Sequence, residues 1–133
     1  MMRIGLILAG GRATRLGGAD KGLVPFQGEP LALRAYRRLS PQVDRILVSA
    51  NRSFDEYRKV LPSDTELIPD RTDSFPGPLA GLEAAIASLP EESRKETWLF
   101  TVPCDCPFFP SDLTEKLIFA ANAAGARAAI AEA

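Results

Sequence analysis

The chain has 133 residues, which is enough for one domain with a buried hydrophobic core. Its 16 basic and 17 acidic residues give a formal net charge of −1, which argues against a general nucleic-acid binder. The sequence contains no histidine, so nucleophilic catalysis by a Ser–His or Cys–His pair and histidine-ligated metal sites are excluded.

The sequence shows no targeting signal. No apolar run approaches the ~18 residues of a membrane span, and the first residues lack the pattern of a signal peptide. Two cysteines, Cys104 and Cys106, flank one aspartate, which is poor spacing for a structural disulfide or a zinc site. We therefore expect a protein of the reducing cytoplasm that binds neither nucleic acid nor a membrane.

Apolar runs and helix-like patterns alternate along the chain. In chain order the sequence predicts a strand over 3–9, a glycine-rich loop over 10–21, a helix over 30–39, a strand over 44–50, a helix opening at 53–56, a strand over 65–68, a helix over 78–89, a charged turn over 91–96, a strand over 97–102, a helix from 111 to about 124, and the start of a further strand over 126–131. Such alternation is typical of a mostly parallel sheet with helices on both faces. The expected fold class is α/β, with three αβα layers and a Rossmann-like sheet, in a single domain over 1–133.

Local signals support the predicted helices. Ser53 stands three residues before Glu56, which is the spacing of a capping box, and Ser111 is placed to cap the last helix. The helix over 78–89 carries apolar residues at helical spacing that predict one buried face: Leu79, Leu82, Ala85, Ile86 and Leu89. The arginines of the helix over 30–39 are expected on a solvated face: Arg34, Arg37 and Arg38.

The residues that carry chemistry follow the predicted strands. In open parallel sheets, ligands bind beyond the carboxyl ends of the strands, near a switch in strand order. The glycine-rich loop follows the first strand, Asp70 follows the third, and Asp105 follows the fourth. We expect these three segments to form a ligand site at one edge of the sheet.

The loop over 10–21 combines glycines with two bases, Arg15 and Lys21. Glycines let the backbone approach a ligand closely and turn its N–H groups toward one point. Arg15 can present two parallel donors to phosphate oxygens, and Lys21 adds a point charge. A polyphosphate uses all of these features, although the loop matches neither the P-loop nor the dinucleotide-binding fingerprint. The alternative is a flexible surface loop with solvated charges.

The same loop resembles the signature of nucleotidyltransferases, and more narrowly that of the molybdenum cofactor guanylyltransferases of the MobA family. The resemblance rests on Leu8-Ala9-Gly10-Gly11, Arg15, Gly17-Gly18, Asp20-Lys21 and Leu23. Three later segments agree with it in the right order: 67–70, 75–81 with its Gly-Pro-Leu turn, and 102–107 around Asp105. The resemblance covers nearly the whole chain.

The resemblance implies transfer of GMP from GTP to the terminal phosphate of molybdopterin, with release of pyrophosphate. It implies a Mg²⁺ cofactor, with Arg15, Lys21 and Asp105 as catalytic residues that align the reactants and neutralise charge. The attacking phosphate is already ionised, so no general base is required. The alternatives are a related enzyme that uses CTP or a sugar phosphate, and a nucleotide-binding module without turnover.

The resemblance also implies which residues bind the nucleotide. They are Leu8, Ala9, Gly10, Gly11, Lys21, Ser49, Asp70 and Asp105. The Gly10-Gly11 pair indicates guanine, because relatives that use CTP tend to carry Leu-Ala-Ala-Gly at this place. Ser49 stands where close relatives can have asparagine, and Asn51 is the nearby amide that could replace it. A role as a turn residue stays open for Asp70.

Asp105 is the predicted ligand of Mg²⁺. It lies between two prolines at a strand end, where a carboxylate that faces a triphosphate is a natural ligand of this ion. Its alternative role is to cap the helix that begins near Ser111. Cys104 and Cys106 are expected to be small buried or half-buried residues beside this site.

Members of the family usually continue past this point, with a downstream Asn-x-Asn-Thr-Pro-like segment implied in metal and pterin binding. We therefore expect a fragment or a shortened protein, with the nucleotide half present and much of the acceptor site absent. Apolar surface left exposed by the absent part predicts a homodimer. The other expected partners are GTP, molybdopterin, and proteins that mature molybdenum enzymes.

Overall fold

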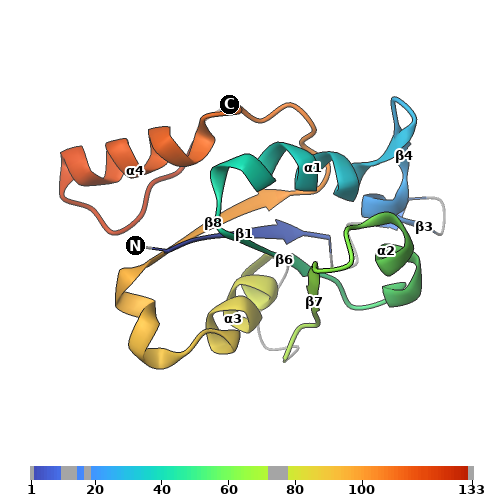
Figure 1. The fold of residues 1–133 in the computed structure, drawn as a ribbon, viewed down its shortest axis with the longest axis horizontal. Helices are drawn as coiled ribbons and strands as arrows, with labels where there is room; N and C mark the ends of the chain where they lie inside the picture. The colour runs from blue at the N-terminus through green and yellow to red at the C-terminus, as the bar shows by residue number, and fades with distance from the viewer. Residues whose placement is uncertain (1, 10–14, 17–18, 72–77, 132–133) are drawn as a thin grey trace.

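The fold is built on a parallel sheet of four strands (Figure 1). The computed structural model describes residues 2–9, 15–16, 19–71 and 78–131. The strands are β1 (Met2–Leu8), β6 (Arg45–Ser49), β7 (Glu66–Ile68) and β8 (Thr97–Pro103), in the order β7-β6-β1-β8. All of them confirm strands predicted from the sequence. The strand order reverses at β1, because β6 and β8 pair with its opposite edges.

Helices cover both faces of the sheet, as the sequence predicts. On one face pack α1 (Leu31–Leu39), α2 (Phe54–Val60) and α4 (Leu113–Ala124), and on the other packs α3 (Pro78–Ser88). Figure 1 shows α1 and α4 above the sheet and α3 below it. Short 3-10 helices occur at Lys21–Leu23, Ser40–Gln42 and Glu91–Glu96. No helix in the described ranges is long and apolar enough to cross a membrane.

The alternation of side chains along β1 divides the hydrophobic core between the two faces. Ile4 and Leu6 belong to the cluster beneath α3, whereas Ile7 belongs to the larger cluster formed with α1 and α2. Gly5 lies on the α1 side, where an added Cβ would stand 2.4 Å from Cδ2 of Leu39. The absence of a side chain at Gly5 therefore lets α1 approach the sheet closely.

The buried face of α3 differs in part from the predicted one. The residues that lie against the sheet are small: Ala80, Gly81, Ala84 and Ala85. Leu79 is 52% exposed and Ile86 is 41% exposed, although both were expected in the core. Ala85 and Leu89 are buried as predicted, and Leu82 packs against their cluster. Leu79 and Ile86 are exposed instead, because α3 approaches β1 and β6 closely at Gly81 and small residues occupy that contact.

Other local predictions were only partly right or were wrong. Ser53 is the N-cap residue of α2, so the helix opens where predicted, but its φ is +60° and its side chain makes no capping hydrogen bond. The N-cap of α4 is Asp112 rather than Ser111, and the Asp112 side chain makes no capping bond either. Residues 126–131 form no strand, since an extended segment becomes a strand only where a neighbouring strand pairs with it.

Two short antiparallel pairs were not predicted. They are β2 (Arg15–Leu16) with β3 (Ala19–Asp20), and β4 (Pro25–Phe26) with β5 (Glu29–Pro30). Gln27 and Gly28 connect β4 to β5 with φ values of +53° and +85°. Two positive φ values are typical of a tight hairpin turn, which Asn-Gly signals and Gln-Gly does not.

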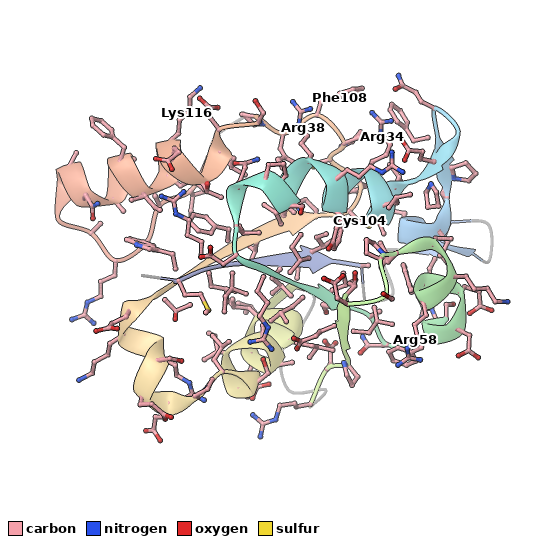
Figure 2. The ribbon with its side chains drawn as sticks, viewed as in Figure 1. Arg34, Arg38, Arg58, Cys104, Phe108 and Lys116 are labelled. Carbon is pink, nitrogen blue, oxygen red and sulfur yellow. The ribbon has the colours of Figure 1, made fainter. Side chains whose placement is uncertain are left out.

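Two of the three arginines on α1 are not solvated as predicted. The guanidinium of Arg34 lies 5.1 Å from the ring centre of Phe26 and 6.0 Å from that of Phe108. The Nε–H of Arg38 donates to the carbonyl of Phe109. Figure 2 shows Arg34, Arg38 and Phe108 on the same side of α1. These contacts hold the loop after β8 against α1.

Candidate functional site

The exits of the strands are held together at the carboxyl edge of the sheet. Backbone N–H groups continue the hydrogen bonding one residue past the strand ends: Ala9 donates to Ser49 (2.9 Å), Cys104 to Leu8 (3.1 Å) and Ala50 to Ile68 (3.1 Å). The loops that follow the strands therefore leave from adjacent points. This is the edge where the sequence predicts a ligand site.

Lys21 and Asp105 form an ion pair at this edge. Lys21 begins the 3-10 helix after β3, and Asp105 lies in the turn after β8. Their Nζ and Oδ2 atoms are 3.0 Å apart, although the residues stand 84 positions apart in the sequence. The side chains are 30% and 42% exposed, so a ligand from solvent can reach both. The hydrogen bond and negative charge of Asp105 raise the pKa of Lys21, which keeps its ammonium protonated.

Aromatic contacts hold the chain segments of these two residues against each other. The ring of Phe26, in the hairpin that follows Lys21, meets the ring of Phe108, in the loop that follows Asp105. The two ring centres are 5.5 Å apart in an edge-to-face arrangement, and the Arg34 guanidinium lies near both. The segments that carry Lys21 and Asp105 are therefore joined by this aromatic contact as well as by the ion pair.

The residues on either side of Lys21 are buried. The Asp20 side chain is 3% exposed, and its Oδ1 lies 2.5 Å from Nε of Arg52, which follows β6. Gly22 lies against Tyr57, where an added Cβ would stand 2.7 Å from the phenol oxygen. Burial, with a smaller effect of the Asp20 charge, raises the pKa of Tyr57. The backbone on both sides of Lys21 is therefore held in place, by Arg52 after β6 and by Tyr57 of α2.

Sequence reasoning missed Arg52 and Tyr57. Neither residue belongs to a recognisable motif, and each meets its partner only because the fold brings distant segments together. Arg52 stands 32 positions from Asp20 in the sequence. The only available signal was its place directly beyond a predicted strand, where parallel sheets collect functional side chains.

Asp70 follows β7 and pairs with Asn51, which follows β6. The Nδ2–H of Asn51 donates to Oδ2 of Asp70 (2.9 Å), and the N–H of Asp70 donates to Oδ1 of Asn51 (2.8 Å). The other carboxylate oxygen of Asp70 is buried, and no described residue forms a hydrogen bond with it. The amide therefore orients the carboxylate, while the predicted nucleotide contact of Asp70 stays a prediction.

Three predicted nucleotide-binding residues lie at or just beyond the carboxyl ends of β1 and β6: Leu8, Ala9 and Ser49. Ser49 is 3% exposed and Ala9 is 2% exposed. An added Cβ on Gly81 would stand 2.7 Å from Oγ of Ser49 and 3.1 Å from Cδ2 of Leu8, so both side chains pack on α3. Their predicted contacts with a nucleotide stay predictions.

The two cysteines differ in their surroundings. Cys104 is 1% exposed, as expected, and burial together with the charge of Asp105 raises its pKa to about 11. Its thiol therefore stays protonated at neutral pH. Cys106 is exposed, contrary to the expectation, because it lies in the open turn beyond Asp105. Both are free thiols, and the cytoplasmic location stays a prediction.

Asp105 is suited to a metal ion that arrives with its ligand. Within the described ranges, no group of three His, Cys, Asp or Glu side chains is placed to hold a metal. Mg²⁺ is usually bound through one or two carboxylates together with substrate phosphates, rather than by a cage of protein ligands. A single accessible carboxylate beside a lysine fits this arrangement.

Several predicted site residues lie outside the described part of the chain. Gly10 and Gly11 are among them, so the predicted guanine contact stays a prediction. For Arg15 the structure describes the backbone only, in β2, where it pairs with Asp20 of β3. Its predicted contact with phosphate is therefore not tested.

The chain is similar to proteins that carry one kind of domain. Residues 5–133 match the family described as MobA-like NTP transferase domain. A molybdenum cofactor guanylyltransferase of Burkholderia ambifaria is 48% identical over 128 residues, which are 96% of this chain and 60% of that protein. One of Ralstonia nicotianae is 46% identical over 127 residues, which are 95% of this chain and 58% of that protein.

Solved structures agree with the fold. A CMP:2-keto-3-deoxy-manno-octonic acid synthetase complexed with CTP has a TM-score of 0.69 at 18% identity, over 95% of this chain and 49% of that one. Rv0371c from Mycobacterium tuberculosis has a TM-score of 0.67 at 21% identity, over 92% of this chain and 61% of that one. The chain spans about 60% of the length of the curated relatives it matches. It belongs to the MobA-like NTP transferase family.

Proposed function

We propose that this chain is the nucleotide-binding part of an enzyme that transfers GMP from GTP to the terminal phosphate of molybdopterin. The observation that carries the proposal is the accessible Lys21–Asp105 pair, in a chain 48% identical to a protein named molybdenum cofactor guanylyltransferase. A triphosphate bound with Mg²⁺ needs a cation for its phosphate oxygens and a carboxylate for the metal. The pair supplies one of each at the edge where open sheets bind ligands.

The reaction requires positioning and charge neutralisation more than proton transfer. An oxygen of the acceptor phosphate bonds to the α-phosphorus of GTP, the bond from that phosphorus to the bridging oxygen breaks, and pyrophosphate leaves. Lys21 and Arg15 bind phosphate oxygens, and Asp105 holds Mg²⁺. When bound, the ion neutralises charge that develops on the α-phosphate and on pyrophosphate.

Binding of the nucleotide with its metal would replace the ion pair between Lys21 and Asp105 by contacts of each residue with the ligand. In the free chain, Lys21 and Asp105 neutralise each other at 3.0 Å. In the complex, Lys21 would pair with phosphate oxygens and Asp105 would hold the cation, so each charge would keep a partner of opposite sign. This exchange is the reason to expect that GTP and Mg²⁺ bind more tightly together than either does alone.

Calorimetric titration of the chain with GTP and with CTP, in the presence of Mg²⁺, tests the proposal. We expect GTP to bind more tightly than CTP, and Asp105→Asn to weaken GTP binding by about tenfold or more, because one charged contact is lost. Asp55→Asn is the matched control, since this carboxylate on α2 is 89% exposed. Equal binding of the two nucleotides, or an Asp105→Asn variant that binds like the wild type, contradicts the proposal.

Turnover is a separate question, because the chain covers only part of its relatives. Release of pyrophosphate from GTP in the presence of molybdopterin tests it, and binding without release indicates a nucleotide-binding module. The homodimer expected from the sequence also stays a proposal. Light scattering on the purified chain measures it directly.

A further inference from the structure

We infer that Arg52 is a positioning residue that acts through Asp20 to hold Lys21 opposite Asp105. The importance of Lys21 for a nucleotide rests on the proposed function, whereas its positioning by Arg52 does not. The inference follows from the burial of Asp20, from the attachment of Arg52 to two strand exits, and from the place of Lys21 between two anchors.

Asp20 links the arginine to the lysine. Its backbone lies in β3 immediately before Lys21, and its carboxylate is 3% exposed and 2.5 Å from Nε of Arg52. A carboxylate removed from water is stable only beside a compensating charge. Asp20 therefore keeps its buried place because the guanidinium is there, and a change at Arg52 moves the residue next to Lys21.

Arg52 is itself attached to the carboxyl edge of the sheet. Asn51, directly before it, forms two hydrogen bonds with Asp70 beyond β7, of 2.9 and 2.8 Å. The N–H of Ala50 donates to the carbonyl of Ile68 at 3.1 Å. Arg52 therefore belongs to a segment that is hydrogen-bonded to the residues after β7. Its ion pair with Asp20 fixes the loop that holds Lys21 relative to this edge of the sheet.

The other side of Lys21 has its own anchor. The N–H of Val24 donates to the carbonyl of Lys21 (3.1 Å), and the N–H of Leu31 donates to the carbonyl of Val24 (3.0 Å). Tyr57 fills the space beside Gly22. Lys21 is therefore held between this turn and the Asp20–Arg52 ion pair.

Amide hydrogen exchange on the chain without nucleotide tests the positioning. Arg52→Gln is expected to speed exchange at Val24 by about tenfold or more, because the turn loses its N-terminal anchor. Arg52→Lys keeps a cation near Asp20 and is expected to restore most of the protection; it also carries the test if Arg52→Gln does not fold. Arg45→Gln is the matched control, because Arg45 lies on β6, the strand that Arg52 follows, and bonds Glu66 twice, at 2.8 and 2.6 Å. Equal exchange at Val24 in Arg52→Gln and Arg45→Gln overturns the inference.

A double-mutant cycle in GTP binding shows whether Arg52 acts through Lys21. With Mg²⁺ present, Arg52→Gln is expected to weaken binding by about tenfold in the wild-type background and by little in a Lys21→Ala background. An equal loss in both backgrounds shows a direct or purely structural role and overturns the inference. If the wild-type chain binds no GTP, the proposed function fails, while the exchange measurement still decides whether Arg52 positions Lys21.

Discussion

At the scale of single residues, Gly81 is where α3 touches two residues predicted to bind nucleotide. Replacing a glycine in a helix interior by alanine normally stabilises a protein by about 1 kcal/mol. At Gly81 the new Cβ would stand 2.7 Å from Oγ of Ser49 and 3.1 Å from Cδ2 of Leu8, and such overpacking costs about 1–3 kcal/mol. Ser49 is short and buried, so we expect Gly81→Ala to lower the free energy of unfolding, measured in urea, by about 1 kcal/mol.

A second substitution separates this contact from other effects of Gly81→Ala. Ser49→Ala removes the oxygen that the new Cβ would meet. The double variant is therefore expected to be more stable than Gly81→Ala alone. A Gly81→Ala chain as stable as the wild type would show instead that α3 can shift away from β6 at no cost.

At the scale of secondary structure, α4 begins with a cap that comes from a distant residue. The N–H of Thr114, in the first turn of α4, donates to Oε1 of Gln42 (3.0 Å). The Nε2–H group of Gln42 donates to the carbonyls of Arg38 (3.0 Å) and Pro110 (3.2 Å). Gln42 is 9% exposed and Thr114 is fully buried. One amide therefore joins the end of α1 to the start of α4.

Gln42→Met is expected to destabilise the chain by about 2–4 kcal/mol. Methionine has a similar length but leaves the Thr114 N–H and the Pro110 carbonyl without a partner, and each buried unpaired group costs about 1–3 kcal/mol. Thr114→Val is the control, because it removes only the hydroxyl that donates to the Gln42 carbonyl (3.2 Å). Urea unfolding of both variants gives the comparison. A Gln42→Met chain no less stable than Thr114→Val would show that water replaces the distant cap.

These elements show which parts of the fold a sequence can predict. The strands and helices follow from periodic apolar residues, so in the described part of the chain the four strands of the parallel sheet and the four α-helices were all expected. The cap of α4 was predicted wrongly at Ser111, because the group that satisfies this helix end is Gln42, 72 positions away from Thr114 in the sequence. Leu79 and Ile86 of α3 were wrongly predicted to be buried, because hydrophobic spacing alone does not reveal how closely a helix approaches a sheet.

The candidate site likewise has a part that the sequence predicts and a part that it does not. Lys21, Asp70 and Asp105 were predicted because each follows a strand, or the loop after a strand, and parallel strands end at one edge. Which of them meet could not be predicted: Lys21 pairs with Asp105, whereas Asp70 pairs with Asn51. Such pairings depend on side-chain packing across segments distant in the sequence, for which the sequence carries no local pattern.

At the scale of the whole molecule, Tyr57 couples the packing of α2 to the loop that holds Lys21. Tyr57 is fully buried in the core cluster shared by α1, α2 and the sheet. Its hydroxyl reaches Gly22, which lies in the short helix after β3. Exposure of this phenol therefore requires the opening of the main core together with the Lys21 turn, so its ionisation reports on the folded state as a whole.

Stability at high pH is expected to fall because of this tyrosine. Burial raises the pKa of Tyr57 above its ordinary value of about 10, so the folded chain keeps the phenolic proton at a pH where the unfolded chain loses it. Below pH about 10 both states hold the proton and the contribution of Tyr57 to stability is complete; above it, the free energy of unfolding falls by up to about 1.4 kcal/mol per pH unit. Cys104 adds a similar fall in the free energy of unfolding that begins nearer pH 9, since its pKa is raised from 9.0 to about 11.

Urea unfolding of wild type and Tyr57→Phe between pH 8 and 11 measures the contribution of Tyr57, with Tyr36→Phe as a control that keeps the full dependence of stability on pH. The phenylalanine variant at position 57 is expected to lose less stability above pH about 10, and an unchanged slope would mean that Tyr57 ionises without opening the core.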